Sequence, residues 1–208
     1  RSTLFPYTTL FRSALALGLR DYFQAIAAQS GRRCHVITTK ASTSTSRYNP
    51  AGRLDGDELA DAVYEVTFAD DETISLHYAT LSRRLLQVSA HALTDLAISR
   101  ARKSGAGRAW EVSLPDLVDL MSLDDLRANS PQFSPENAAR VLRYFADVEA
   151  NGNEKDVGDV RDRLAIITDT AAGQVLAAGG ITLEDAIRAG DIVCFSLDAA
   201  NADRKSVV

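Results

Sequence analysis

Apolar residues at the start of the chain follow the spacing of a helix and then of a strand. Between Leu19 and Ser30 they recur every three or four positions, and Gly31 follows as a C-terminal cap, which predicts a helix. Cys34–Thr39 (CHVITT) is a short run rich in β-branched residues, which is typical of a buried strand. A helix followed by a buried strand is the second half of a β-α-β unit.

The middle of the chain, residues 57–150, has a helical pattern almost throughout. Its longest apolar stripe predicts a helix from about Ile74 to Arg102, which ends at Gly105 with cations in its last turn. Val63–Phe68 is the only doubtful strand in this region. Capping residues, a proline start and apolar spacing predict four further helices, at Ser113, Ser122, Ser134-Pro135 and Val160–Ile167.

A helix followed by a strand returns near the end of the chain. Thr182 opens a short helix that stops at Gly190, and Ile192–Leu197 (IVCFSL) is a continuous apolar run. Continuous hydrophobicity indicates a strand covered on both faces, as in a parallel sheet. This order predicts an α/β fold, a partial doubly wound parallel sheet with an inserted all-α domain. The expected domains are 14–56 (α/β), 57–155 (all-α insert) and 156–202 (return to α/β).

Both ends of the chain read like translated synthetic DNA. Tyr7–Ser13 corresponds to TAC ACG ACG CTC TTC CGA TCT, the end of a common sequencing adapter. Its reverse complement, read one base later, contains GAT CGG AAG AGC GTC GTG, which encodes Asp203–Val208. One oligonucleotide read on opposite strands explains both segments. We therefore expect residues 1–13 and 203–208 not to be native, and we leave them out of the fold.

Composition and charge narrow the class of protein. Hydrophobic residues make up 46% of the 208 positions and charged residues 25%, which favours a folded segment over a disordered one. The net charge of −5 argues against a surface that binds nucleic acid all over, but allows a local basic patch. Cys34 and Cys194 fit reduced, buried thiols rather than a metal site or a disulfide framework. No apolar run is long enough to cross a bilayer, so this segment is expected to be soluble.

Common signatures of catalysis are missing from the sequence. It contains no G-x-x-x-x-G-K-[ST] phosphate loop and no G-x-G-x-x-G, H-E-x-x-H, G-x-S-x-G or C-x-x-C pattern. His77 and His91 stand about four turns apart on one predicted helix, too far to share a metal ion. We interpret them, with His35, as surface or hydrogen-bonded core histidines. The sequence therefore assigns no catalytic, nucleotide-binding or metal-ligating residue.

Five short sequence motifs, which we call phrases, follow one another along the chain. They are Tyr48-Asn49-Pro50, Gly56–Asp61 (GDELAD), His77–Leu86 (HYATLSRRLL), Ser113–Leu117 (SLPDL) and Ala189–Asp198 (AGDIVCFSLD). In this order and spacing they resemble the TraG/TraD-type coupling proteins of bacterial conjugation and type IV secretion, over nearly all of Leu19–Ala200. The chain departs from the family at Ala51, where leucine is usual, and in the polar loop Thr43–Ser46.

The resemblance implies a fold and an activity. Coupling proteins look like ring-forming P-loop motors of the RecA/FtsK type, so the α/β part is expected to be RecA-like. The parent protein would form a homo-hexamer on the cytoplasmic side of the bacterial inner membrane. It would use ATP and Mg²⁺ to move single-stranded DNA or relaxosome proteins into a type IV secretion channel. The Walker A and Walker B segments would fall upstream of Ala14 and downstream of Ala202, so this chain alone is predicted to be inactive.

The best candidate for a nucleic-acid contact is a cluster of cations around the turn Gly105–Gly107. Mobile cations at a helix end can contact the phosphate backbone without recognising the base sequence. The cluster consists of Arg100, Arg102, Lys103 and Arg108. The alternative, which we favour, is that these cations neutralise the helix dipole and aid solubility. Arg83 and Arg84 could supply an arginine finger to the ATP of a neighbouring subunit. We favour a simpler interpretation, in which the stem of one arginine covers the apolar face of the helix and the other arginine is solvated.

Two other functions fit the same patterns. One is a non-enzymatic α-helical interaction module, in which Cys34–Thr39 and Ile192–Leu197 would not be neighbours in one sheet. The other is an FtsK- or HerA-like translocase, a class of motor that usually lacks so large a helical insertion. The placement of the two strands therefore distinguishes the interaction module from the coupling protein and from the FtsK- or HerA-like translocase.

Overall fold

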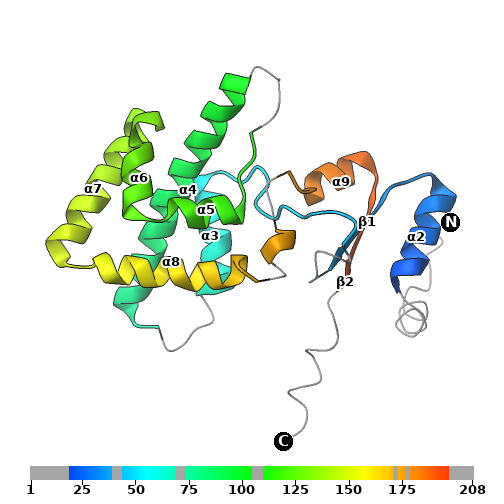
Figure 1. Ribbon diagram of the computed structural model, residues 1–208, viewed down its shortest axis with the longest axis horizontal. Helices are drawn as coiled ribbons and strands as arrows, with labels where there is room; N and C mark the ends of the chain where they lie inside the picture. Colours follow the sequence, from blue (N-terminus) through cyan, green and yellow to red (C-terminus); the bar gives the residue numbers. More distant parts are fainter. Residues whose placement is uncertain are drawn as a thin grey trace, which may run out of the picture.

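The computed structural model describes residues 19–38, 44–68, 74–104, 110–170, 173–176 and 179–196. In the sequence, a group of helices, which we call the helical body, lies between two helix-strand pairs, and in space both pairs lie on one side of it (Figure 1). The pairs are α2 (Leu19–Ser30) with β1 (Cys34–Thr38), and α9 (Leu183–Ala189) with β2 (Ile192–Ser196). The helical body consists of α3 (Gly56–Thr67), α4 (Leu76–Ser104), α5 (Leu114–Leu120), α6 (Leu123–Asn129), η2 (Ser130–Gln132), α7 (Pro135–Asn151) and α8 (Glu154–Thr168). A 3₁₀ turn, η3 (Gly173–Val175), follows it.

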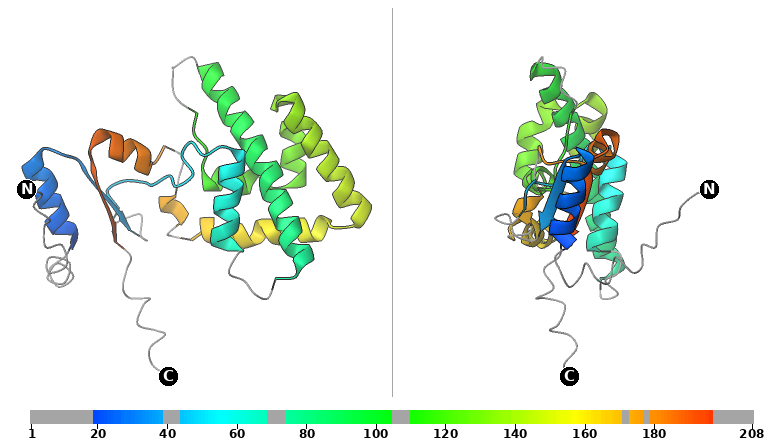
Figure 2. Two further views of the ribbon diagram at one scale, coloured as in Figure 1. Left: turned by 180° about the vertical axis from the view of Figure 1, so that it is seen from behind. Right: turned by 90° about the vertical axis from the view of Figure 1, so that its right-hand side faces the viewer.

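β1 and β2 pair in parallel, although the helical body lies between them in the sequence. Cys34 stands opposite Ile192, and the register runs without a break to Thr38 opposite Ser196. The prediction that these two strands are neighbours in one sheet is confirmed. The sheet lies between α2 and the helical body (Figures 1 and 2). Thr39 and Leu197, at the ends of the predicted strands, lie outside the described residues, as do the segments 1–13 and 203–208.

The predicted fold class is wrong. In the part of the chain that is described, the only sheet has two strands, and most residues are helical. The fold is a helical body joined to a small parallel sheet, not a partial RecA-like doubly wound α/β sheet with an insert. The apolar run of β2 indicated cover on both faces, but Phe195 is 48% exposed. The large hydrophobic core lies among the helices instead.

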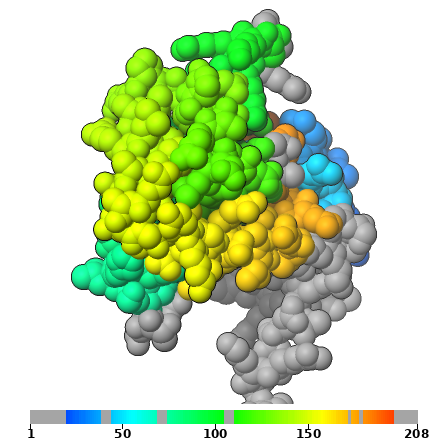
Figure 3. Space-filling view, turned by 60° about the vertical axis from the view of Figure 1, so that its left-hand side comes forward, coloured from blue at the N-terminus to red at the C-terminus, as the bar shows by residue number. Residues whose placement is uncertain are grey.

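The helical body has a hydrophobic core of its own. Leu85 and Leu86 of α4 are fully buried in it, and Leu117, Val141 and Val160 close it from three other helices. The apolar stripe predicted for the long helix faces this core, because spacings of three and four residues return to one side of a helix. Figure 3 shows the outer surface of the body, with α8 beside the η3 turn.

Serine residues cap three helices at the positions that the sequence predicts. The hydroxyls of Ser113, Ser122 and Ser134 each accept a hydrogen bond from the backbone N–H three residues on. Asp55 and Glu58 form a capping box at the start of α3. This helix runs to Thr67 and takes in most of the doubtful strand 63–68. None of the helices in the described ranges is both long and apolar enough to cross a membrane.

Candidate functional site

Two of the five phrases meet where the sheet joins the helical body. The buried side chain of Asn49 donates from Nδ2 to the Val112 carbonyl oxygen at 2.9 Å. Its Oδ1 accepts from the Gly52 N–H at 3.1 Å, so both ends of the amide are satisfied. The Tyr48 ring meets Phe195 of β2 edge to face, with centroids 5.0 Å apart. The Tyr48-Asn49-Pro50 phrase therefore connects the sheet to the start of the helical body.

A third phrase holds α3 against α4. Gly56 opens α3 at a point where an added Cβ would lie 2.4 Å from His91 Nδ1 and 2.9 Å from the His91 Cα. His91 Nε2 lies 2.9 Å from Asp57 Oδ1. His91 is thus a hydrogen-bonded histidine, as predicted. His77 is exposed, with its Nε2 3.7 Å from Asp156 Oδ2.

A polar network joins the start of β2 to β1. His35 Nε2 lies 3.0 Å from Asp191 Oδ2, and His35 Nδ1 lies 2.8 Å from Ser46 Oγ. Arg33 Nη2 also contacts Asp191 at 3.1 Å. The hydrogen bond from His35 is the main cause that holds the pKa of Asp191 below its usual range. Desolvation opposes it, and the Arg33 charge adds to the lowering.

Serine, histidine and aspartate in such a row resemble a triad for acyl transfer, and the sequence did not predict this grouping. In a working triad the carboxylate stabilises the imidazolium that forms when histidine takes the serine proton. Here the Arg33 guanidinium already neutralises the Asp191 carboxylate. The three side chains also come from the adjoining ends of the two strands and the loop after β1. We therefore assign this network to joining the strands.

The structure divides the predicted cation cluster at the end of α4. Arg102 and Lys103 are exposed in the last turn, which projects from the helical body (Figures 1 and 3). Arg108 lies outside the described residues. Arg100 lines a hollow together with carboxylates, which would repel a phosphate. These carboxylates are Asp116, Asp119 and Asp125.

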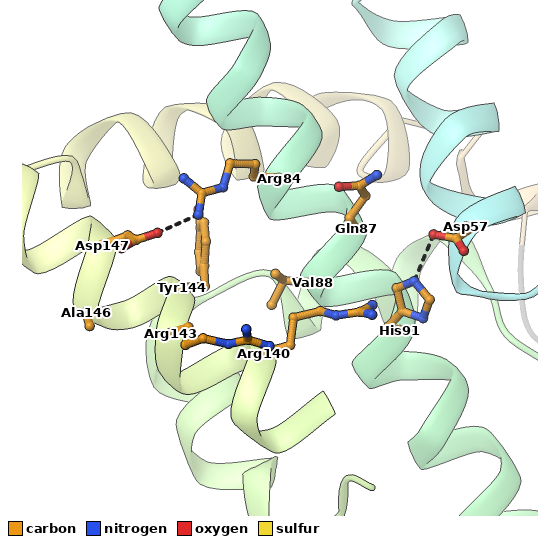
Figure 4. Close-up of a pocket in the computed structure, with 10 residues that line it drawn as sticks. All are labelled: Asp57, Arg84, Gln87, Val88, His91, Arg140, Arg143, Tyr144, Ala146 and Asp147. Carbon is orange, nitrogen blue, oxygen red and sulfur yellow. Dashed lines mark hydrogen bonds and ion pairs between the residues drawn. The ribbon is translucent and has the colours of Figure 1, made fainter. Parts of the chain in front are cut away.

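A second set of cations surrounds a hollow of about 650 Å³ between α4, α7 and the start of α3. We call it the arginine hollow, because Arg84, Arg140 and Arg143 line it (Figure 4). Arg84 comes from α4, and the other two arginines come from successive turns of α7. Within the lining, Asp57 and Asp147 are the only carboxylates. With His91 neutral, the formal charge of the lining is therefore positive.

The three arginines differ in how firmly they are paired. Arg84 forms an ion pair with Asp147 at 2.5 Å. Arg140 lies 3.6 Å from Glu136, one turn away on the same helix. Arg143 donates a hydrogen bond from Nε to the Ala139 carbonyl oxygen at 3.3 Å. The guanidinium groups of α7 are therefore the ones that remain most open to an external anion.

Tyr144 adds a buried hydroxyl to the same hollow. The residue is 3% exposed, and its hydroxyl has no hydrogen-bond partner in the described structure. Burial raises the pKa of Tyr144, and the nearby Arg84 charge opposes part of that rise. The hydroxyl is therefore a neutral donor that lacks an acceptor, which is uncommon for a buried polar group.

Sequence reasoning missed the arginine hollow because its members are spread over two helices about sixty positions apart along the chain. The one local signal is the spacing of Arg140 and Arg143, which places both on one face of a helix. Arg83, the neighbour of Arg84, takes no part in the hollow. Its guanidinium lies 3.5 Å from Asp61 and covers the Tyr64 ring.

No group of three or more His, Cys, Asp or Glu residues that could hold a metal ion occurs in the described ranges. Cys34 and Cys194 are both free thiols, on opposing strands, and burial raises the pKa of each. Comparison with known proteins finds no family model, no curated protein and no solved structure that matches this chain.

Proposed function

We propose that this chain is part of an ATP-driven translocase of the coupling-protein type, and that its helical body engages the DNA or protein that is moved. The observation that carries the proposal is the parallel pairing of β1 and β2. His35 and Asp191, 156 residues apart, are in contact across the sheet, so the chain leaves β1, forms the helical body and returns to the neighbouring strand. A helical interaction module with two unrelated strands does not account for this pairing.

The contacts of the phrase residues support the same proposal. Tyr48 and Phe195 bring the first and last phrases together, and Asn49 links them to the segment before α5. Gly56 permits the close approach of α3 to α4. Ser113 caps α5. Residues of four of the five phrases thus make structural contacts, which gives their ordered spacing a physical reason and favours a common architecture over chance agreement.

The described residues do not fit ATP and Mg²⁺. They contain neither a glycine-rich phosphate loop nor a group of three metal ligands. In this proposal, ATP and Mg²⁺ are bound by other parts of a hexameric protein at the bacterial inner membrane. This chain contributes contact with single-stranded DNA or relaxosome proteins.

The experiment that tests the proposal is to read the genomic DNA on both sides of the codons for residues 14–202. We expect a G-x-x-x-x-G-K-[ST] phosphate loop upstream, followed by a helix that precedes α2. Downstream we expect a hydrophobic strand that ends in an acidic residue, which would hold Mg²⁺. A reading frame that lacks both features would contradict the translocase and favour an interaction module.

A further inference from the structure

We propose that the arginine hollow binds the phosphodiester backbone of single-stranded DNA through Arg84, Arg140 and Arg143. This inference rests on the proposed function, because it assigns the contact with the moved strand to one surface of the helical body. It moves that contact away from the predicted cluster at the end of α4, where carboxylates surround Arg100.

The first argument is the availability of charge. Arg143 has no ion pair within the described residues. Its bond to the Ala139 carbonyl uses Nε, so its two terminal amino groups remain available. The Glu136 side chain that pairs with Arg140 is 81% exposed, so this pair is weak and easily exchanged. Two guanidinium groups one turn apart can thus exchange water or a weak partner for phosphate oxygens.

The second argument is the shape of the charge distribution. Figure 4 shows the guanidinium of Arg84 directed toward Asp147, while that of Arg140 reaches toward His91 on the other side of the hollow. Guanidinium groups that spread apart in this way do not converge on one small dianion. They suit a polymer with one charge in each repeating unit, and a phosphodiester strand has that spacing of charge.

The third argument is the Tyr144 hydroxyl. Figure 4 shows Tyr144 beside the Arg84 side chain. A phosphate that draws the Arg84 guanidinium away from Asp147 would open the way to this donor, and its oxygen would supply the missing acceptor. The volume of about 650 Å³ is large enough for a nucleotide unit of the strand.

The test measures binding of a fluorescein-labelled 12-nucleotide oligo(dT) to the full chain by fluorescence anisotropy between 50 and 200 mM salt. The double variant Arg140→Gln/Arg143→Gln is expected to bind at least tenfold more weakly. The slope of log K against log salt concentration should fall by about 0.7 for each phosphate that is no longer neutralised. Circular dichroism should show an unchanged helix content, because Arg143 is exposed, Arg140 is half-buried and neither belongs to the hydrophobic core.

The matched control is Arg102→Gln/Lys103→Gln, which removes the same two charges from the projecting end of α4. We expect it to leave both the affinity and the slope close to those of the wild type. An equal loss in the two double variants would overturn the proposal, because binding would then depend on net charge alone. Failure of the wild type to bind oligo(dT) would overturn it as well.

Competition identifies the ligand. Unlabelled oligo(dT) should displace the probe at concentrations at which pyrophosphate and an oligo-glutamate peptide do not. If pyrophosphate displaces it equally well, the hollow is a small-anion site. If the peptide displaces it better, the partner is an acidic protein; either result overturns the proposal. These outcomes are independent of the test of the translocase, because the presence of a phosphate loop in the flanking DNA does not depend on the binding results.

Discussion

Gly56 lies where α3 packs closely against α4. A methyl group there would meet the His91 Cα at 2.9 Å, and backbone cannot rotate away as a side chain can. We expect Gly56→Ala to lower the free energy of unfolding by about 1–3 kcal/mol, as overpacking does. Urea unfolding followed by circular dichroism measures this change.

The matched control for Gly56 is Gly158, in the interior of α8, where a Cβ would have no neighbour within 4 Å. Alanine there should stabilise the protein by about 0.5–1 kcal/mol, because glycine carries an entropic cost in a helix. The two substitutions should therefore have opposite signs. The same sign for both would contradict the close α3–α4 packing.

Asn49 is the buried polar residue at the junction of the sheet and the helical body. Asn49→Ala would leave the Val112 carbonyl and the Gly52 N–H without their partners. We expect a loss of about 1–3 kcal/mol in the free energy of unfolding. Asn151→Ala, which removes one exposed side-chain bond at the end of α7, should change it by less than about 0.5 kcal/mol. An equally small effect at Asn49 would show that the junction does not depend on this amide.

The residues that start helices could be read from the sequence, and those that join helices could not. Ser113 and Ser122 act on N–H groups three residues away, so a local pattern is enough to find them. Gly56 matters only because His91 lies next to it in space. Asn-Pro predicts a turn, but nothing in the local sequence tells that Asn49 reaches the backbone of Val112.

At the scale of elements, the sheet shows how a few loop residues can satisfy the hydrogen bonds of an outer strand edge. On the outer edge of β1, the Val36 N–H donates to Thr45 Oγ1 at 2.8 Å, and the Thr45 N–H donates to the Val36 carbonyl at 2.9 Å. The Thr38 N–H donates to Ser44 Oγ at 2.9 Å. The loop after β1 therefore occupies the edge where a third strand would pair.

This edge explains why the strands could be predicted and the extent of the sheet could not. The apolar runs Cys34–Thr38 and Ile192–Ser196 locate the strands, because few other elements have such runs. Burial of a strand does not reveal what covers it. Here Thr45 and Ser44 take one side of β1, and the sequence of that loop suggested only a polar connection.

Asp191 ties the two strands in a way that depends on pH. Its pKa is lowered in the folded protein, so the folded state favours the ionised form. This contribution to stability is complete above the usual carboxylate pKa of about 3.9, and is lost as the pH falls through the lower folded value. We expect the difference in unfolding free energy between the wild type and Asp191→Asn to be largest near neutral pH and to shrink below about pH 4.

Arg33→Gln provides the comparison, because the Arg33 guanidinium supplies part of the effect on Asp191. In that background, Asp191→Asn should cost less at pH 7 than it does in the wild type. Guanidinium chloride unfolding from pH 7 to pH 3 measures both differences. A cost of Asp191→Asn that stays constant over this range would mean that its charge does not join the strands.

At the scale of the whole molecule, charge gathers where the sequence did not suggest it. The run of cations before Gly105 is the densest basic stretch near a helix end, and it drew the prediction for Arg100, Arg102, Lys103 and Arg108. A surface site depends on which helices pack together, however. The arginine hollow exists because α4 and α7 are neighbours, and sequence spacing alone carries no information about that packing.

The hydrophobic core also divides the molecule. The core cluster contains residues of the helical body and of the segments that border it, and it includes neither Val36 of β1 nor Cys194 of β2. Apolar packing stabilises the helical body and the sheet separately, while the junction at Asn49 joins the two parts mainly by hydrogen bonds. We therefore predict that the helical body and the sheet open as two cooperative units.

Native-state hydrogen exchange of two variants tests this division. Leu85→Ala leaves a cavity in the helical body and should cost about 2–5 kcal/mol in the protection of α3, α4 and α8. The amides of β1 and β2 should lose less. Val36→Ala, at an equally buried position of the sheet, should show the reverse pattern. If each variant instead lowers protection everywhere by the same amount, the chain opens as a single unit, and the junction couples sheet and helices more strongly than its few hydrogen bonds indicate.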